Sequence, residues 1–328
     1  MKIIFSPQES SRLSVERLKF RRDNKKLAIP LGLKSVDEHF NPLLPGDLVT
    51  VIGRPGNGKT GFMVRWARER ADFLSENKIK DRAVLYVTYE QHIEDLQSLQ
   101  LAADQGVNVT KMARGELVGD DWTKILKAAV RRATMPIWYV GHSMANRKER
   151  PHITPSVLID NLQRLENDEG VIVDCVFVDY LQRIPFDGRP ESKTVGTMNV
   201  LDDMKDFALA LNCPFIVGVQ AKREVDSRDV PIPGMDDGQW TSNIEQASDK
   251  IFTVVRPAKY ANEGEMFGSM VVQSYTQMLV TLAKQKLGPD NIATWVYFDP
   301  AYNKLDELEI QHYDLNKDYD TNERKDIY

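Results

Sequence analysis

The stretch Gly53-Arg54-Pro55-Gly56-Asn57-Gly58-Lys59-Thr60 lies between the apolar run DLVTVI (47–52) and the amphipathic run GFMVRWARERADFL (61–74). It matches GxxxxGK[ST], the phosphate-binding P-loop, and has the strand before it and the helix after it that the motif requires. Glycines at this spacing let backbone N–H groups surround a β-phosphate, and the N-terminus of the helix favours the anion. The alternative is a glycine-rich turn with a surface lysine. We expect the stretch from Gly53 to Gly61 to bind ATP, with the Thr60 hydroxyl on Mg²⁺.

Around the P-loop, short apolar runs alternate with amphipathic ones. The apolar runs are AVLYVTY (83–89), PIWYVG (136–141), VIVDCVFVDYL (171–181) and PFIVGVQ (214–220). The amphipathic runs include EDLQSLQLAA (94–103), VLIDNLQRL (157–165) and MNVLDDMKDFALAL (198–211). This alternation predicts an α/β fold, a mainly parallel sheet flanked by helices.

After Asn243 the pattern changes to apolar runs that no helix separates. They are DKIFTVVRP (249–257), VQSYTQMLVTLAKQK (272–286) and ATWVYFDPAY (293–302), and the turn LGPDN (287–291) joins the last two. The sequence therefore predicts an antiparallel C-terminal hairpin at the edge of the sheet.

The composition limits the classes of function. The chain has 328 residues, with 43 Lys and Arg against 48 Asp and Glu, a net charge of −5. Any nucleic-acid contact must therefore be local, because bulk charge does not supply it. Cys175 and Cys213 lie in apolar runs and form no CxxC site, and no run approaches the ~18 apolar residues of a membrane span. We expect a soluble intracellular protein without a signal peptide or membrane contact.

Three segments are predicted. Residues 1–28 form a charged arm with helical spacing, and residues 29–313 form the ATPase domain. Residues 314–328 are charged and nearly free of aliphatic side chains, so we expect them to be disordered. The arm has basic residues that either touch phosphate or line a solvated helix face: Lys19, Arg21, Arg22, Lys25 and Lys26.

Three polar residues end predicted strands on the side where ligands bind in such sheets. Asp179 is positioned as a metal-holding acid on a strand beside the P-loop strand, or it is only a helix N-cap or turn acid. Asp174 competes for the metal role from inside the strand. Glu90 is positioned to approach the γ-phosphate and accept a proton from water, although spacing alone does not decide whether it has this role. Gln220 either contacts the γ-phosphate or is only a polar strand terminus.

Several runs of this sequence together resemble one known protein family. The chain resembles the RecA-type motor domain of DnaB-family replicative helicases over about residues 27–300. The resemblance lies in IPLGLKSVDEHF, PGDLVTVIGRPGNGKT, VLYVTYEQ, VFVDYLQRI, LNCPFIVGVQAKRE, SNIEQASDKIFTVVR and LAKQKLGPDNIATWVYFD.

The resemblance implies a hexameric ring with ATP between subunits and single-stranded DNA in the central channel. It makes Lys59 and Thr60 the phosphate and Mg²⁺ ligands, Glu90 the catalytic base, Asp179 the Walker B acid and Gln220 the γ-phosphate sensor. Lys284 and Lys286 fall on the pair that reaches into the neighbouring ATP site. The second position is usually arginine, and lysine lacks its bidentate fork. From spacing alone, both lysines fit a solvated edge strand.

Two departures from the family pattern bear on partners. The sequence does not include the helical N-terminal domain that usually precedes this motor, which affects primase or loader recruitment; residues 1–28 replace only the linker helix that docks on the next subunit. The stretch 221–241, expected to face the channel, has three basic against five acidic residues. We expect neutralising Asp236 and Asp237 to tighten DNA binding if they line the channel. The predicted DNA contacts are Lys222, Arg223, Arg183, Arg189 and Lys193, and Trp240 either stacks on a base, contacts a subunit or lies in the core.

The sequence thus predicts an ATP-dependent DNA helicase motor of cytoplasmic replication, in a bacterial, phage or plasmid context. The alternative from another class is a RecA/KaiC-like ATP-dependent switch or assembly factor that does not unwind DNA. The two differ in whether single-stranded DNA stimulates the ATPase.

Overall fold

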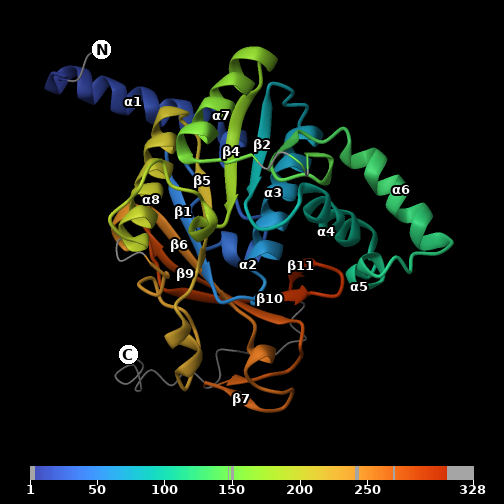
Figure 1. The fold of residues 1–328 in the computed structure, drawn as a ribbon. Helices are drawn as coiled ribbons and strands as arrows, with labels where there is room; N and C mark the ends of the chain where they lie inside the picture. Colours follow the sequence, from blue (N-terminus) through green and yellow to red (C-terminus); the bar gives the residue numbers. More distant parts are fainter. Residues whose placement is uncertain (1–3, 147, 149–150, 241–243, 269, 309–328) are drawn as a thin grey trace.

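A nine-stranded sheet, in the order β11-β10-β9-β6-β1-β5-β4-β2-β3, forms the centre of the chain (Figure 1). The computed structural model describes residues 4–146, 148, 151–240, 244–268 and 270–308. Six strands run parallel to one another: β1 Leu48–Gly53, β2 Arg82–Thr88, β3 Ile137–Gly141, β4 Ile172–Asp179, β5 Phe215–Gln220 and β6 Lys250–Val255. The predicted parallel sheet is therefore confirmed, and the P-loop follows its central strand, β1.

Three antiparallel strands extend the sheet beyond β6. They are β9 Gln277–Gln285, β10 Ile292–Asp299 and β11 Lys304–Glu307. The hairpin of β9 and β10 was predicted, but the outermost strand, β11, was not. A short turn brings β11 back, because Asp299 Oδ1 accepts a hydrogen bond from the Ala301 N–H at 2.9 Å.

The predicted strand 272–286 is shorter in the structure. Its first residues form a turn in which the Ser274 and Thr276 hydroxyls lie 2.8 Å apart, so β9 begins only at Gln277. Before this turn, β7 Met266–Phe267 and β8 Met270–Val271 form a separate two-stranded sheet.

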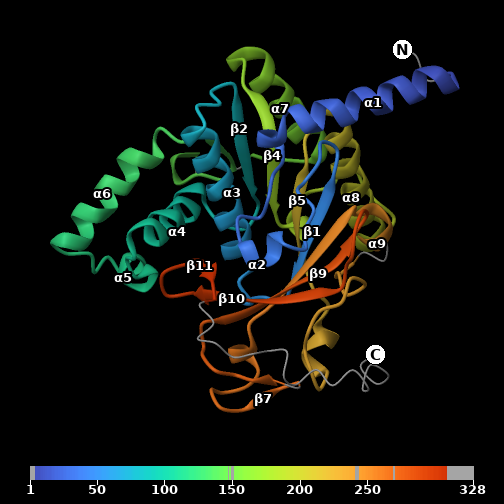
Figure 2. The same ribbon diagram turned by 180° about the vertical axis from the view of Figure 1, so that it is seen from behind.

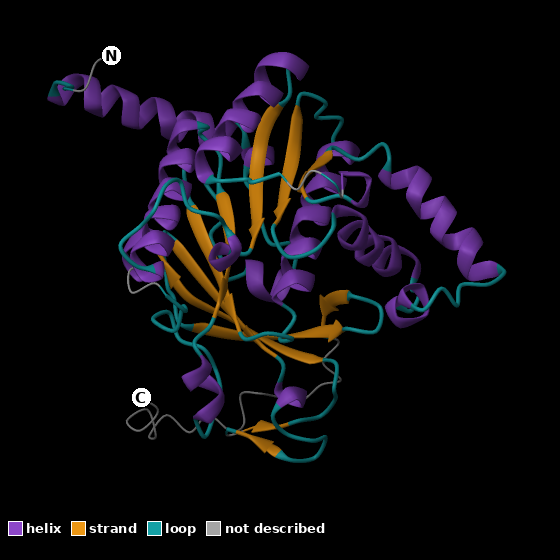
Figure 3. Cartoon of the chain, viewed as in Figure 1, coloured by secondary structure: helices purple, strands orange, loops and turns teal. Residues whose placement is uncertain are grey.

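Helices cover both faces of the sheet, as Figures 1 and 3 show. One face packs against α2 Lys34–Asp37, α3 Lys59–Glu76 and α4 Ile93–Gln105, and the other against α7 Pro155–Glu169, α8 Lys193–Ala210 and α9 Ile244–Ala247. Residues of β1 alternate between the two cores: Val49 and Val51 enter the first, Leu48 and Ile52 the second. This alternation follows from the two-residue period of a strand, and it makes β1 buried throughout. Beyond α4 lie α5 Val109–Ala113 and α6 Asp120–Arg132.

The arm is the helix α1 Pro7–Asp23, which extends away from the sheet (Figures 1 and 2). A capping box starts it: the Ser6 hydroxyl accepts from the Glu9 N–H at 3.3 Å, and Glu9 accepts from the Ser6 N–H at 3.0 Å. No residue of α1 is buried, so its apolar residues, including Leu18 and Phe20, remain exposed. The predicted disordered tail, 314–328, lies outside the described residues.

The P-loop helix α3 holds the root of the arm. Arg70 donates to the carbonyls of Lys26 and Ala28, Trp66 to that of Pro30, and Arg65 to those of Leu31 and Gly32. Arg70 also forms a buried two-bond ion pair with Asp174 of β4, at 2.7 and 3.1 Å. The helix that carries the P-loop is therefore joined to both the arm and the sheet.

Candidate active site

The P-loop conformation depends on its glycines. Gly58 has φ +87°, the left-handed region, and a Cβ there would lie 2.9 Å from the ring of Phe298. A Cβ on Gly61 would approach the same ring to 2.7 Å. The loop thus turns tightly against β10 and directs its backbone towards the N-terminus of α3. That end of an 18-residue helix carries the positive end of the helix dipole and favours phosphate.

Two P-loop side chains meet one carboxylate. Lys59 Nζ lies 3.3 Å from Asp179 Oδ1, and the Thr60 hydroxyl donates to Asp179 Oδ2 at 2.7 Å. The exposed fractions of the Lys59 and Asp179 side chains are 10% and 4%. The Tyr86 hydroxyl, 3.4 Å from the same carboxylate, stays protonated, because burial first and then the charge of Asp179 raise its pKa. These contacts bring together the lysine, hydroxyl and acid that the sequence predicted.

The prediction that the Asp179 strand lies directly beside the P-loop strand was wrong. The order is β1-β5-β4, so β5 separates the two. Asp179 still reaches the P-loop because β5 has Gly218 at the crossing point: a Cβ there would lie 3.3 Å from Asp179 Oδ1 and 3.4 Å from Lys59 Cδ. The absence of a side chain at Gly218 leaves the space in which Lys59 extends over β5.

The donor set fits Mg²⁺. Magnesium is usually bound by one or two protein oxygens together with phosphate oxygens and water, and Thr60 Oγ1 and Asp179 offer such a pair at the P-loop. In the described segments no group of three or more His, Cys, Asp or Glu residues forms a metal cage, so the nucleotide and water would supply the other ligands. The competing acid, Asp174, is held by Arg70 with both side chains at most 2% exposed, which leaves it engaged elsewhere.

Glu90 and Gln220 lie at the same edge of the sheet. Strand β2 ends at Thr88, two residues before Glu90, and Thr88 is in register with Asp179. The Tyr89 N–H donates to the Asp179 carbonyl at 2.9 Å, which brings the exposed Glu90 close to Asp179 along the backbone. Gln220 ends β5 opposite Gly53, and its N–H donates to Gln182 Oε1 at 3.0 Å. The catalytic roles of both residues remain predictions.

Residues after β6 surround the P-loop, and sequence reasoning missed them. The Arg256 N–H donates to Asn57 Oδ1 at 2.8 Å, and its guanidinium lies 5.6 Å from the ring centre of Phe298. Arg256 Nε is buried without a partner among the described atoms. Lys259 Nζ lies 2.8 Å from where a Gly56 Cβ would stand. The only signal was two cations in VVRPAKY (254–260), and no known spacing relates them to the P-loop.

Lys284 and Lys286 lie at the opposite end of the sheet. Lys284 pairs with Ile251, and Ile251 with Thr50, three residues before Gly53. The pair is therefore about 10 Å along the strand from the start of the P-loop. Lys284 donates to the carbonyls of Ser248 and Glu245, and Lys286 forms an ion pair with Asp249 at 3.3 Å. Within one chain, both ammonium groups are directed to α9 and its end.

The predicted DNA contacts follow β4 and β5. Arg183, Arg189 and Lys193 come after β4, while Lys222 and Arg223 belong to the β5 loop, residues 221–240. Two of these lysines are engaged: Lys222 Nζ donates to the Asp236 carbonyl at 2.8 Å, and Lys193 Nζ lies 3.6 Å from the ring centre of Trp240. The other three side chains are exposed.

The expected effect of neutralising Asp236 and Asp237 together needs correction. Asp237 accepts two hydrogen bonds from Arg228, at 2.6 and 2.7 Å, and one from the Gly234 N–H at 2.7 Å. Its side chain is 5% exposed, so it fixes the β5 loop rather than lining an open channel. Only Asp236 of the pair is exposed.

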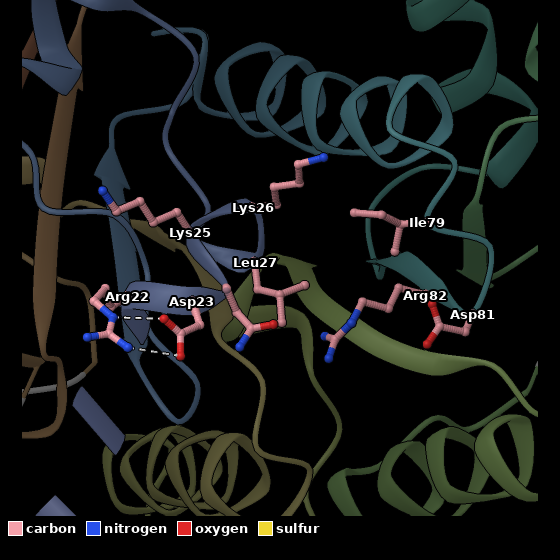
Figure 4. A pocket seen from close by; sticks show the side chains of 9 residues that line it. Arg22, Asp23, Lys25, Lys26, Leu27, Ile79, Asp81 and Arg82 are labelled. Carbon is pink, nitrogen blue, oxygen red and sulfur yellow. Dashed lines mark hydrogen bonds and ion pairs between the residues drawn. The ribbon is translucent and has the colours of Figure 1, made fainter. Parts of the chain in front are cut away.

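A surface pocket of about 570 Å³ lies at the root of the arm, away from the P-loop (Figure 4). Arg82, which begins β2, is at its edge, whereas the phosphate site is at the carboxyl ends of the strands. The pocket is lined by Arg22, Asp23, Asn24, Lys25, Lys26, Leu27, Ile79, Asp81 and Arg82. In Figure 4, Arg22 and Asp23 pair with each other at 2.8 Å.

The fold and the phosphate site define a RecA-like P-loop nucleotide-binding domain. A sequence profile of the DnaB-like helicase C-terminal domain matches residues 28–307, and the chain belongs to this family. In the helices that the structure describes, none has the length and apolar character to cross a membrane.

Individual proteins show the same relationship. The chain is 26% identical over 289 residues to the replicative DNA helicase DnaB of Geobacillus stearothermophilus, covering 88% of this chain and 58% of that protein. It is 27% identical over 282 residues to the replicative DNA helicase DnaC of Bacillus subtilis, covering 86% and 57%. The chain thus spans less than two thirds of the length of these relatives.

Two solved structures share the fold. An ATPase domain superposes with a TM-score of 0.77 at 20% identity, covering 93% of this chain and all of that one. A DnaB-like replicative helicase, described with its interactions with primase, gives a TM-score of 0.72 at 22% identity and covers 86% and 63%.

Proposed function

We propose that this chain is a DNA helicase motor that hydrolyses ATP between the subunits of a ring and uses the cycle to move along single-stranded DNA during replication in the cytoplasm. The observation that carries the proposal is the joint contact of Lys59 and Thr60 with Asp179. Membership of the DnaB-like helicase family supports it.

The roles at the phosphate site follow from the charges. In the free chain Lys59 and Asp179 neutralise each other. With MgATP bound, Lys59 would contact the β- and γ-phosphates, and Asp179 together with Thr60 would hold Mg²⁺. Glu90 then accepts a proton from the attacking water, and Gln220 contacts the γ-phosphate.

The two lysines of β9 support a shared site. Because they lie at the amino-terminal end of the parallel strands, they do not reach the P-loop of their own chain. Lys286 is 72% exposed, and exposed ion pairs are weak, so it is readily released from Asp249. We propose that Lys284 and Lys286 act on ATP bound by the neighbouring subunit, and that the ring is a hexamer.

The arm supplies a second contact between subunits. Helix α1 has 17 residues and buries none of them within its own chain, yet Leu18 and Phe20 are apolar and more than half exposed. Docking of α1 on the next subunit would bury this surface. Primase and a loader are further proposed partners, because a solved relative is described with its primase interactions.

A second candidate is an ATP-dependent switch that does not unwind DNA. The engagement of Lys193 with Trp240 and of Lys222 with Asp236 favours it, because both lysines are withdrawn from phosphate contact in the free chain.

One experiment tests the proposal. The ATPase rate is measured with and without a single-stranded oligo-dT at low salt, and unwinding is followed on a forked duplex, using Lys59→Ala as the inactive reference. We expect oligo-dT to bind and to stimulate wild-type turnover. If oligo-dT neither binds nor stimulates, the helicase function is wrong and the switch replaces it.

A further inference from the structure

We propose that a chain of polar side chains, Asn57–Tyr260–Asp226–Arg54, couples the P-loop to the β5 loop, so that each responds to what the other binds. Asp226 and Tyr260 are positioning residues in this proposal, because they act through Arg54 and Asn57. The DNA half of the coupling rests on the proposed function, since it takes the β5 loop as a DNA contact.

The contacts form a closed circuit. Arg54 donates to Asp226 Oδ2 from Nε at 2.8 Å, and its Nη2 lies 2.7 Å from the same oxygen. The other oxygen of Asp226 accepts from the Tyr260 hydroxyl at 3.0 Å. That hydroxyl accepts from Asn57 Nδ2 at 3.0 Å. The hydrogen bonds thus connect Arg54 of the P-loop to Asp226 of the β5 loop, and Asp226 through Tyr260 back to Asn57 of the P-loop.

The two P-loop residues of this circuit, Arg54 and Asn57, belong to the turn that is proposed to bind the phosphates. The Asn57 N–H donates to the Arg54 carbonyl at 3.1 Å, which closes this turn. Asn57 is 1% exposed and the Arg54 side chain 12% exposed, so neither side chain moves without its partners. A phosphate that reorients the turn therefore displaces Arg54 and Asn57 together.

The far end of the circuit lies beside the proposed DNA contacts. Asp226 is part of the short helix η4 Arg223–Ser227, and its neighbour Val225 is fully buried. Arg54 also donates to the Ala221 carbonyl at 3.0 Å, so it contacts the β5 loop at both Ala221 and Asp226. Lys222 and Arg223 lie between these points.

The β5 loop is stiff enough to move as one body. The Arg228–Asp237 pair and the Lys222 N–H bond to the Asp237 carbonyl, at 2.7 Å, cross-link its two halves. The Gln239 N–H donates to the Gln220 carbonyl at 2.8 Å and ties the end of the loop to β5. A displacement at Asp226 is therefore passed on to the rest of the loop, and the coupling acts in both directions by linkage.

The charge of Asp226 persists under working conditions. The hydrogen bond from Arg54 is the main cause that holds the pKa of Asp226 below its ordinary value, and Tyr260 adds to it. The pair Arg54–Asp226 is thus ionic whenever the protein is active.

The test uses Asp226→Asn, which keeps the shape and removes the charge. Its matched control is Asp229→Asn, the same change at an exposed position of the same loop. Turnover is measured with and without oligo-dT, and amide hydrogen exchange of residues 221–240 with and without Mg-ATPγS. Thermal unfolding is recorded for each variant.

We expect Asp226→Asn to keep basal turnover within about twofold and to lose about fivefold in oligo-dT stimulation, the lower end of couplings between sites. Nucleotide-dependent protection of the β5 loop should also disappear. Asp226→Glu should restore part of both, and the control should match the wild type. Tyr260→Phe, which keeps the ring, should show a smaller loss in the same direction.

Other outcomes separate the two proposals. Wild-type stimulation and loop protection in Asp226→Asn would overturn the coupling, and so would an equal loss of basal and stimulated turnover with a lower Tm, which marks a purely structural role. If oligo-dT fails to stimulate even the wild type, but Asp226→Asn still abolishes nucleotide-dependent protection of the loop, the coupling stands and the DNA function fails.

Discussion

The two ends of the parallel strands differ in how much of a site one chain supplies. At the carboxyl end, Lys59, Thr60 and Asp179 already contact one another. At the amino end, the contacts of Lys284 and Lys286 within the described residues are to backbone carbonyls and to Asp249. The first end is organised within the chain, whereas the proposed function gives the second end a target on the neighbouring subunit.

Burial explains this difference. The Lys59–Asp179 pair is almost fully buried, so each charge needs a new partner before the two separate, and under the proposed function phosphate and Mg²⁺ would be those partners. The Lys286–Asp249 pair leaves the lysine 72% exposed, and such pairs contribute at most about 1 kcal/mol. We therefore expect the Lys59–Asp179 contact to persist in the free chain and Lys286 to exchange Asp249 for another partner more easily.

The largest effect is expected at the carboxyl end. Glu90→Gln should keep MgATP binding but lose turnover by ~10²-fold or more, because the water loses its base. Lys59→Ala should weaken nucleotide binding itself. Binding of a fluorescent ATP analogue and single-turnover hydrolysis separate the two, with Lys304→Ala, an exposed lysine of β11, as the control. Near-normal turnover of Glu90→Gln would remove Glu90 from the base role.

The amino end is tested by mixing subunits. If Lys286 acts on the neighbouring site, equal amounts of Lys286→Ala and wild type should lose more activity than dilution predicts. If one inactive subunit stops a whole ring of six, the mixture should keep only roughly 2% of full activity. If the subunits act independently, it should keep half.

The same mixture made with Lys304→Ala serves as the control and should keep full activity. A strictly proportional loss with Lys286→Ala, together with a monomeric mass in MgATP, would assign a complete site to each chain.

These two ends also differ in how well the sequence predicts them. The P-loop was predictable because glycine, lysine and threonine at fixed spacing have one common use. The parallel strands followed from hydrophobic runs, but their order did not: no local pattern reveals that Gly218 lets Lys59 cross β5. Arg256 and Lys259 were missed because folding, not spacing, brings β6 beside β1. The pairing of Asp237 with Arg228 was hidden in the same way, so a count of charges misjudged the β5 loop.

The DNA contacts should give an intermediate effect. Lys222→Ala with Arg223→Ala should reduce the slope of log affinity against log salt by roughly 1.4, at about 0.7 for each lost phosphate contact. Oligo-dT binding is measured by fluorescence anisotropy from low to moderate salt. Lys127→Ala with Lys304→Ala, two exposed lysines outside the predicted DNA contacts, is the control. An unchanged slope would show that the β5 loop does not contact DNA.

Within the β5 loop, substitution of Asp236 and of Asp237 should have opposite effects on DNA binding. Asp236→Asn should tighten oligo-dT binding slightly, since it removes an exposed negative charge. Asp237→Asn should instead weaken binding and lower the Tm, because it breaks a pair whose carboxylate is 5% exposed. Anisotropy and thermal unfolding of both variants check this. If both substitutions tighten oligo-dT binding equally, Asp237 lines the channel after all.

The smallest expected effect is the response to pH near neutrality, where the Arg54–Asp226 pair should not act as a switch. The hydrogen bond from Arg54 holds the folded-state pKa of Asp226 below its ordinary value, which is about 3.9 in an unfolded chain. A carboxyl whose pKa is lowered by folding stabilises the folded state fully when the pH is above its unfolded pKa. This stabilisation is lost as the pH falls through its folded pKa. Oligo-dT stimulation should therefore vary less than about twofold between pH 6 and 8 in the wild type. A steep wild-type profile in that range that becomes flat in Asp226→Asn would show that Asp226 titrates near neutrality, against the Arg54 pairing.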